Sequence, residues 1–134
     1  MSAALIDPDD ARFHLGVQEM DRVHGEFIAL VNAMAEADQA GFLELFARLV
    51  EHTKAHFDGE EQQMTETRCP ALQEHRADHQ RVLGDLWAIG QRSTPVQVAM
   101  GRAYVREQLP TWFAVHAATM DSALAAHLKA KSGS

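Results

Sequence analysis

The chain has 134 residues, of which 12 are basic and 19 acidic, and its net charge is -7. This length corresponds to one domain that can bury roughly two-thirds of the surface its unfolded chain would expose. The acidic balance, without a basic patch interleaved with aromatic residues, argues against nucleic acid as a partner, and no stretch approaches the ~18 apolar residues of a membrane span.

The N-terminal segment MSAALIDPDD lacks the positive start and the long apolar run of a signal peptide. The single cysteine, Cys69, cannot form an internal disulfide, which suits a reducing compartment. Arg68 is its only basic neighbour in the sequence, so we favour an ordinary side chain over a reactive thiol. We therefore expect a cytoplasmic protein without a membrane partner.

Apolar residues recur at intervals of three and four along four segments, and no β-alternation of useful length is present. The first predicted helix runs from about Val17 to Ala37, and Gly41 with its polar neighbours is expected to end it. The second spans about Phe42 to Thr67. Cys69-Pro70 breaks it, because proline cannot continue a helix and restricts the residue before it.

The third predicted helix runs from Leu72 and stops near Gly90. The fourth has a clear start at Thr94-Pro-Val-Gln97, a capping-box pattern with proline at the first helical position. Pro110 is expected to kink this helix, because its ring disturbs the preceding turn.

Four helices joined by short connections predict an all-α protein, an up-down-up-down four-helix bundle. The bundle would occupy residues 17–129. Residues 1–16 would form an N-terminal arm and residues 130–134 a C-terminal tail. We expect a monomer.

Each predicted inward stripe carries imidazole near its middle. A single histidine in such a place is more often a core residue bonded to a backbone carbonyl than a metal ligand. Five together favour metal, because each unpaired polar group in one dry core costs about 1–3 kcal/mol and five imidazoles cannot easily satisfy one another. The five are His24, His56, His75, His79 and His116.

Two spacings place donor atoms one helical turn apart on one face, His56-x-x-x-Glu60 and His75-x-x-x-His79. Glu60 continues the inward stripe of the second helix, whereas its neighbour Glu61 points about 100° away and is expected to be a surface or supporting acid. Asp121 follows His116 by five residues. It would lie ~140° away on an ideal helix, so spacing alone does not select it.

The order His…His-x-x-x-Glu…His-x-x-x-His…His-x-x-x-x-Asp resembles the seven-ligand pattern of the hemerythrin family. The segments LGVQEMDRVH (15–24), HFDGEEQQM (56–64) and WFAVHAATMD (112–121) are similar to that family's blocks around the same ligands. The resemblance extends from about Leu15 to Leu128. The single-domain format resembles the bacterial members, the bacteriohemerythrins.

This resemblance implies a non-heme di-iron centre. Three histidines would hold one iron, two would hold the other, and two carboxylates would bridge both beside an oxo or hydroxo group. The two-histidine iron would have one vacancy, where dioxygen would bind. The three histidines would be His75, His79 and His116, the two would be His24 and His56, and the bridging carboxylates would be Glu60 and Asp121.

Reversible binding of dioxygen, for carriage, storage or delivery, is the leading interpretation, with an oxygen-consuming acceptor as a possible partner. A di-iron enzyme or sensor that handles oxygen, peroxide or nitric oxide stays open as the alternative. Against the enzyme, oxygen-activating bundles usually carry Glu-x-x-His pairs, which these motifs lack. Against the sensor, sensors of the family are generally fused to a signalling domain. A zinc hydrolase fits poorly, because His-Glu-x-x-His is absent and seven ligands exceed one tetrahedral shell.

His52 stands where relatives usually have tyrosine, one turn before His56 on the same face. We favour a packed or partly wetted core position for it over a hydrogen-bond donor or proton route beside the oxygen pocket. Its role stays open.

The position of Glu60 on the inward stripe leads to a prediction about two neighbouring acids. Glu60→Ala should lose the binuclear centre, whereas Glu61→Ala should keep it, since only Glu60 continues the inward stripe. Iron content per purified chain is the measurement. Equal loss in both variants would show that the inward face is assigned wrongly.

Overall fold

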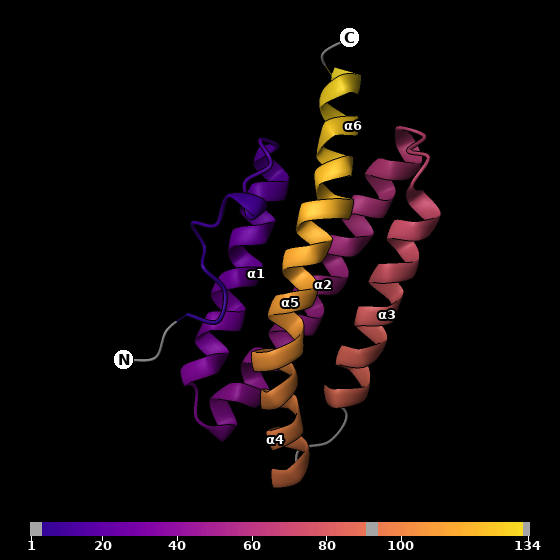
Figure 1. Cartoon of the computed structure of the whole chain (residues 1–134). Coiled ribbons are helices and arrows are strands. Elements are labelled where there is room, and N and C mark those ends of the chain that lie inside the picture. The colour runs from indigo at the N-terminus through magenta and orange to yellow at the C-terminus, as the bar shows by residue number, and fades with distance from the viewer. Residues whose placement is uncertain (1–3, 91–93, 133–134) are drawn as a thin grey trace.

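The computed structural model describes residues 4–90 and 94–132, and in these ranges every regular element is a helix (Figure 1). After a short 3-10 turn come three long helices and then a fourth, built of α-helical segments joined by π-helical turns. This confirms the predicted all-α bundle. The first elements are η1 (Ala11–Phe13), α1 (Gln18–Glu36), α2 (Gln39–Glu66) and α3 (Leu72–Gly90). The fourth helix comprises α4 (Pro95–Ala103), η2 (Tyr104–Gln108), α5 (Leu109–His116), η3 (Ala117–Asp121) and α6 (Ser122–Ser132).

The connection between α1 and α2 corrects one expectation. Gly41 does not end the first helix but lies in the first turn of α2. The cause is Asp38, whose side chain accepts a hydrogen bond from the Gly41 N–H at 2.8 Å and so caps the helix. An aspartate at this position satisfies an amide that has no partner within the helix, and α2 therefore begins at Gln39 rather than at the expected Phe42.

The end of α2 lies where Cys69-Pro70 predicted it. Arg68 adopts a left-handed conformation with φ of 55°. The Cys69 N–H donates to the Met64 carbonyl at 2.8 Å, and the Arg68 N–H donates to the Thr65 carbonyl at 3.3 Å. This is the Schellman arrangement, which satisfies carbonyls at a helix C-terminus.

The fourth helix begins as its sequence predicted. The Thr94 side chain accepts from the Gln97 N–H at 3.3 Å, and Pro95 occupies the first turn. The expected disturbance near Pro110 takes the form of the π-helical turn η2, which ends immediately before Leu109. Because proline cannot donate to the preceding turn, the regular α-helical bonding is interrupted here.

The apolar core divides into a large cluster and a small one, and the candidate site residues fall between them along the helices. In α1, His24 lies between Met20 of the small cluster and Phe27 of the large one. In α2, Glu60 lies between Phe57 of the large cluster and Met64 of the small one. A polar layer therefore crosses the bundle with apolar packing on both sides.

The N-terminal arm runs beside α1 and packs against the bundle (Figure 1). The Ile6 N–H donates to Asn32 Oδ1 at 3.0 Å, and Asn32 Nδ2 donates back to the Ile6 carbonyl at 2.9 Å. Phe13 is buried and stacks on Phe113 at a ring distance of 4.8 Å. At the other end of the chain α6 continues to Ser132. Residues 1–3 of the expected arm and 133–134 of the expected tail lie outside the described residues.

None of the helices in the described ranges is both long and apolar enough to cross a membrane.

The capping of α2 can be tested at Asp38. Asp38→Ala should lower the free energy of unfolding by about 1 kcal/mol, because the Gly41 N–H loses its acceptor. Asp38→Asn keeps a side-chain oxygen at this position and serves as the control. Denaturant unfolding followed by circular dichroism is the measurement, and equal stability of the alanine variant and the parent would contradict the assigned helix start.

Candidate metal centre

The seven residues singled out in the sequence lie together in the polar layer. They come from all four long helices: α1 provides one, α2 and α3 two each, α5 one and the π-helical turn η3 one. Six of them are buried, and His56 is partly buried with 7% of its side chain exposed. The set is His24, His56, Glu60, His75, His79, His116 and Asp121.

Three of the histidines surround one pair of carboxylate oxygens. His75 Nε2 lies 3.1 Å from Glu60 Oε1 and also 3.1 Å from Asp121 Oδ1. His79 Nε2 lies 3.3 Å from Glu60 Oε1, and His116 Nε2 lies 3.1 Å from Asp121 Oδ1. One donor atom from each of these five residues lies within 4.8 Å of all the others, so the group could hold a metal ion.

The other two histidines face the remaining oxygens of the same carboxylates. His56 Nε2 lies 2.7 Å from Glu60 Oε2, and His24 Nε2 lies 2.9 Å from Asp121 Oδ2. His24, His56 and Glu60 form a second group that could hold an ion. Each carboxylate therefore presents one oxygen to the three-histidine group and its other oxygen to the two-histidine group.

The π-helical turn η3 explains the position of Asp121. In a regular α-helix this residue would lie ~140° around the axis from His116. The turn Ala117–Asp121 has π-helical bonding, in which residues five apart are joined, so Asp121 comes back over His116. As a result Asp121 Oδ1 reaches His116 Nε2 although the sequence spacing disfavours it.

The outer nitrogens of three histidines have oxygen partners. His79 Nδ1 donates to Glu61 Oε2 at 3.0 Å, and His116 Nδ1 donates to Asp78 Oδ2 at 2.8 Å. These partners accept and do not donate when ionised, so each Nδ1 must carry the proton. In the neutral ring Nε2 then presents a lone pair toward the cluster, as a metal ligand requires.

His24 is held in the same way by the N-terminal arm. Its Nδ1 lies 3.1 Å from the Phe13 carbonyl, which can only accept. The Phe113 ring packs edge-on against His24 at 5.3 Å. The arm therefore orients a residue of the two-histidine group.

The inner face of the three-histidine group fits a cation. Five of its atoms are buried and have no hydrogen-bond partner, although they lie close to one another. Lone pairs on neutral imidazoles repel carboxylate oxygens at such distances, and unpaired buried polar atoms are costly. A metal ion among them would satisfy all five, and imidazole with carboxylate is a donor set that suits iron. The atoms are Nε2 of His75, His79 and His116, Glu60 Oε1 and Asp121 Oδ1.

The pKa shifts of histidines and carboxylates in the cluster also indicate that it stabilises positive charge. Burial by itself would lower the pKa of His75, but its contacts with Asp121 and Glu60 raise it to about 9. The pKa values of His24 and His116 are also raised, since the contacts with Asp121 outweigh the effect of burial. Burial would raise the pKa of Glu60 and of Asp121, yet the surrounding histidines hold both well below their usual range.

Aromatic rings fix the orientation of the three-histidine group. Phe57 stacks on His79 with ring centroids 3.7 Å apart and planes inclined by 2°. Trp112 stacks on His116 at 4.8 Å, and its Nε1 donates to Asp78 Oδ2 at 3.0 Å. Trp112 therefore supports the carboxylate that orients His116, in addition to packing in the bundle.

Asp78 and the Phe13 carbonyl were not foreseen from the sequence. An acid beside a candidate histidine, as Asp78 is beside His79, was an available signal. On a helix, Asp78 points ~100° away from its neighbour His79. The proximity of Asp78 to His116 depends on how α3 and α5 pack. Glu61 is the supporting acid that its helix position predicted, since it contacts His79 from outside the cluster.

His52 lies in the wall of a cleft between α1 and α2, with its side chain 21% exposed. Its Nε2 is 3.0 Å from Glu26 Oε1. This position is partly wetted, and His52 is outside both groups that could hold a metal.

Comparisons with known proteins agree with this geometry. The family model described as Hemerythrin HHE cation binding domain matches residues 15–128. A bacteriohemerythrin of Ralstonia nicotianae is 37% identical over 108 residues, which cover 81% of this chain and 78% of that protein. No solved structure matches the chain. The chain belongs to the hemerythrin family, and its buried cluster of histidines and carboxylates suits a non-heme iron site.

The Asp78 contact leads to a prediction. Asp78→Ala should weaken metal binding by about 10- to 100-fold, because His116 Nδ1 loses the acceptor that sets its tautomer and orientation. Asp78→Asn keeps an oxygen acceptor and should lose less. Asp85→Ala removes an exposed carboxylate from the same helix as the control. Competition with a chelator measures the affinity, and an Asp78→Ala value equal to the control would contradict the supporting role.

Proposed function

We propose that this chain is a non-heme di-iron protein that binds dioxygen reversibly, for carriage, storage or delivery. The observation that carries the proposal is the division of the two buried carboxylates. Glu60 turns Oε1 toward His75 and His79 and Oε2 toward His56, while Asp121 turns Oδ1 and Oδ2 toward opposite groups in the same way. A carboxylate shared in this manner is suited to bridging two ions.

The assignment of ligands follows from that division. Three histidines would complete the shell of one iron, and two would leave the other iron one ligand short, once both carboxylates and an oxo or hydroxo group bridge the pair. Two ferrous ions held by these residues would supply the two electrons that reversible binding of dioxygen requires. The three-histidine set is His75, His79 and His116, the two-histidine set is His24 and His56, and the bridges are Glu60 and Asp121.

The rest of the bundle supports reversible binding rather than chemistry on a substrate. The apolar clusters on both sides of the polar layer limit the water that reaches it. Glu61, Asp78 and the Phe13 carbonyl hold the rings in place from outside. Five imidazoles and two carboxylates nearly saturate two iron ions, whereas oxygen-activating bundles use Glu-x-x-His pairs.

Metal content and oxygen cycling test the proposal. The purified protein should contain two irons per chain. After anaerobic reduction, admission of air should produce a visible absorption band that disappears when oxygen is removed and returns on the next cycle. One metal per chain would contradict the di-iron site, and irreversible loss of the band with conversion of an added substrate would favour a di-iron enzyme.

A matched pair of variants checks the ligands in the same assay. His75→Leu should destroy the centre, because it removes a donor that faces both carboxylates. His127→Leu is the control, since His127 contacts Thr67 outside the cluster. Oxygen binding that persists in His75→Leu would overturn the ligand assignment.

A further inference from the structure

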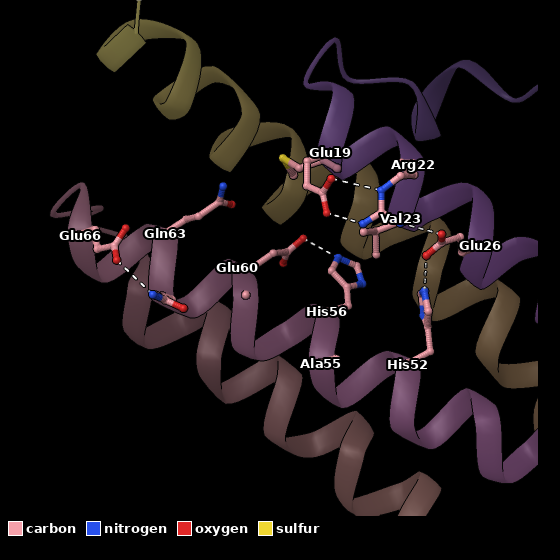
Figure 2. Close-up of a pocket in the computed structure, with 13 residues that line it drawn as sticks. Glu19, Arg22, Val23, Glu26, His52, Ala55, His56, Glu60, Gln63 and Glu66 are labelled. Atoms are coloured by element: carbon pink, nitrogen blue, oxygen red, sulfur yellow. Dashed lines mark hydrogen bonds and ion pairs between the residues drawn. The ribbon is translucent and has the colours of Figure 1, made fainter.

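A cleft of about 440 Å³ lies between α1 and α2, and we name it the α1–α2 cleft. His56 and Glu60 are part of its wall (Figure 2), and both belong to the two-histidine half of the proposed centre. Ala55 and Gly59 also line it. A Cβ built at Gly59 would meet no atom within 4 Å, so the cleft is open at this point.

The α1–α2 cleft reaches the cluster, because His56 and Glu60 line it. His56 is the one residue of the seven that is not fully buried. Four further pockets in the described part of the chain are lined by none of the seven residues. A small molecule in the cleft is therefore already beside the half of the centre that has the proposed vacancy.

The mouth of the α1–α2 cleft is acidic. Three carboxylates line it, those of Glu19, Glu26 and Glu66, against one guanidinium, that of Arg22, so its net charge is -2 with histidine counted as neutral. Arg22 is held by ion pairs with both Glu19 and Glu26 on α1 (Figure 2). Glu26 also reaches across the cleft to His52 on α2, at 3.0 Å.

These charges are exposed but close enough to influence the centre. The Glu19 and Glu26 side chains are 62% and 46% exposed. The pKa of Glu19 is lowered mainly by its hydrogen bond with Arg22, so its carboxylate is negatively charged at neutral pH. Glu19 and Glu26 line the same cleft as His56 and Glu60, and the field of such exposed charges weakens as salt screens it.

We infer that the α1–α2 cleft is the entrance to the two-histidine half of the centre, and that its acidic mouth favours cations and neutral molecules over small anions. The inference rests on the proposed function for the identity of that centre. A negative mouth raises the local concentration of cations and lowers that of anions, whereas it leaves an uncharged diatomic molecule unaffected. Ferrous ion during loading and dioxygen would enter freely, and small anionic metal ligands would be slowed.

The route is tested by filling the cleft. Gly59→Leu adds a side chain in the α1–α2 cleft, and Gly84→Leu adds the same side chain at an exposed glycine of α3 where a Cβ also meets nothing within 4 Å. Gly59→Leu should slow both uptake of Fe²⁺ by the metal-free chain and binding of azide by the ferric protein. Gly84→Leu should leave both rates unchanged. Equal rates in the two variants would overturn the route.

The charge selection is tested by a pair of double variants with the same net charge. Glu19→Gln/Glu66→Gln removes two carboxylates from the mouth and leaves the contact between Glu26 and His52 in place. Glu44→Gln/Glu107→Gln removes two exposed carboxylates that lie outside the cleft, where they pair with Arg48 and Arg106. At low ionic strength the mouth variant should take up Fe²⁺ at least about twofold more slowly and bind azide at least about twofold faster.

The opposite signs for the two probes are the decisive result. Both changes should disappear at ~1 M salt, where screening is nearly complete. Changes of the same sign for Fe²⁺ and azide, or changes equal to those of the control variant, would overturn the selection by charge. If the parent protein fails to hold two irons, the proposed function is overturned as well. If it holds two irons but the cleft variants show unaltered rates of Fe²⁺ uptake and azide binding, only the entrance is overturned.

Discussion

Two carboxylates in the middle of the bundle, Glu60 and Asp121, place the strongest constraint on this structure. Two negative charges in an apolar interior are prohibitively costly unless positive charge or hydrogen-bond donors surround them. Each helix brings imidazole to this layer, and the raised pKa values of His24, His75 and His116 indicate that the carboxylates stabilise positive charge on these three rings. Iron ions would supply the same compensation, and the unpaired inner atoms are placed to receive them.

The two halves of the layer are built differently. The three-histidine half is enclosed by Phe57 and Trp112 and is held from outside by Glu61 and Asp78, whose carboxylates fix the orientation of two rings. The two-histidine half has a backbone carbonyl of the N-terminal arm behind His24, and it borders the α1–α2 cleft. One half is thus enclosed, while the other borders a cleft. This asymmetry is what a centre needs if one iron is to hold the structure and the other is to receive a ligand.

The fourth helix adapts its backbone to the site. A regular helix cannot direct His116 and Asp121 to the same point, because five residues correspond to ~140° of rotation beyond one full turn. The π-helical turn η3 removes this mismatch, at the cost of irregular hydrogen bonding within one turn. The apolar residues on either side, Phe113 and Leu124, are buried and keep the helix in place across the irregularity.

Much of the fold was predictable from the sequence, because its signals are local. Apolar residues at intervals of three and four define helices whatever their neighbours, so α1, α2, α3 and the fourth helix were placed within a few residues. The end of α2 at Cys69-Pro70 and the start of α4 at Thr94 follow from proline and capping chemistry. Gly41 was misread, because an aspartate three residues earlier caps the next helix and the glycine lies inside its first turn.

In the candidate site, too, local sequence signals identified some residues, whereas tertiary packing decided the role of others. The five histidines and Glu60 were visible in the sequence, because polar residues on an inward stripe require a reason to be there. The sequence pattern could include Asp121 by family resemblance alone, since only the backbone of η3 brings it beside His116. Likewise the roles of Asp78, of the Phe13 carbonyl and of the α1–α2 cleft arise where separate helices and the arm meet. Helical periodicity determines which face a residue occupies, and tertiary packing decides which atoms it meets there.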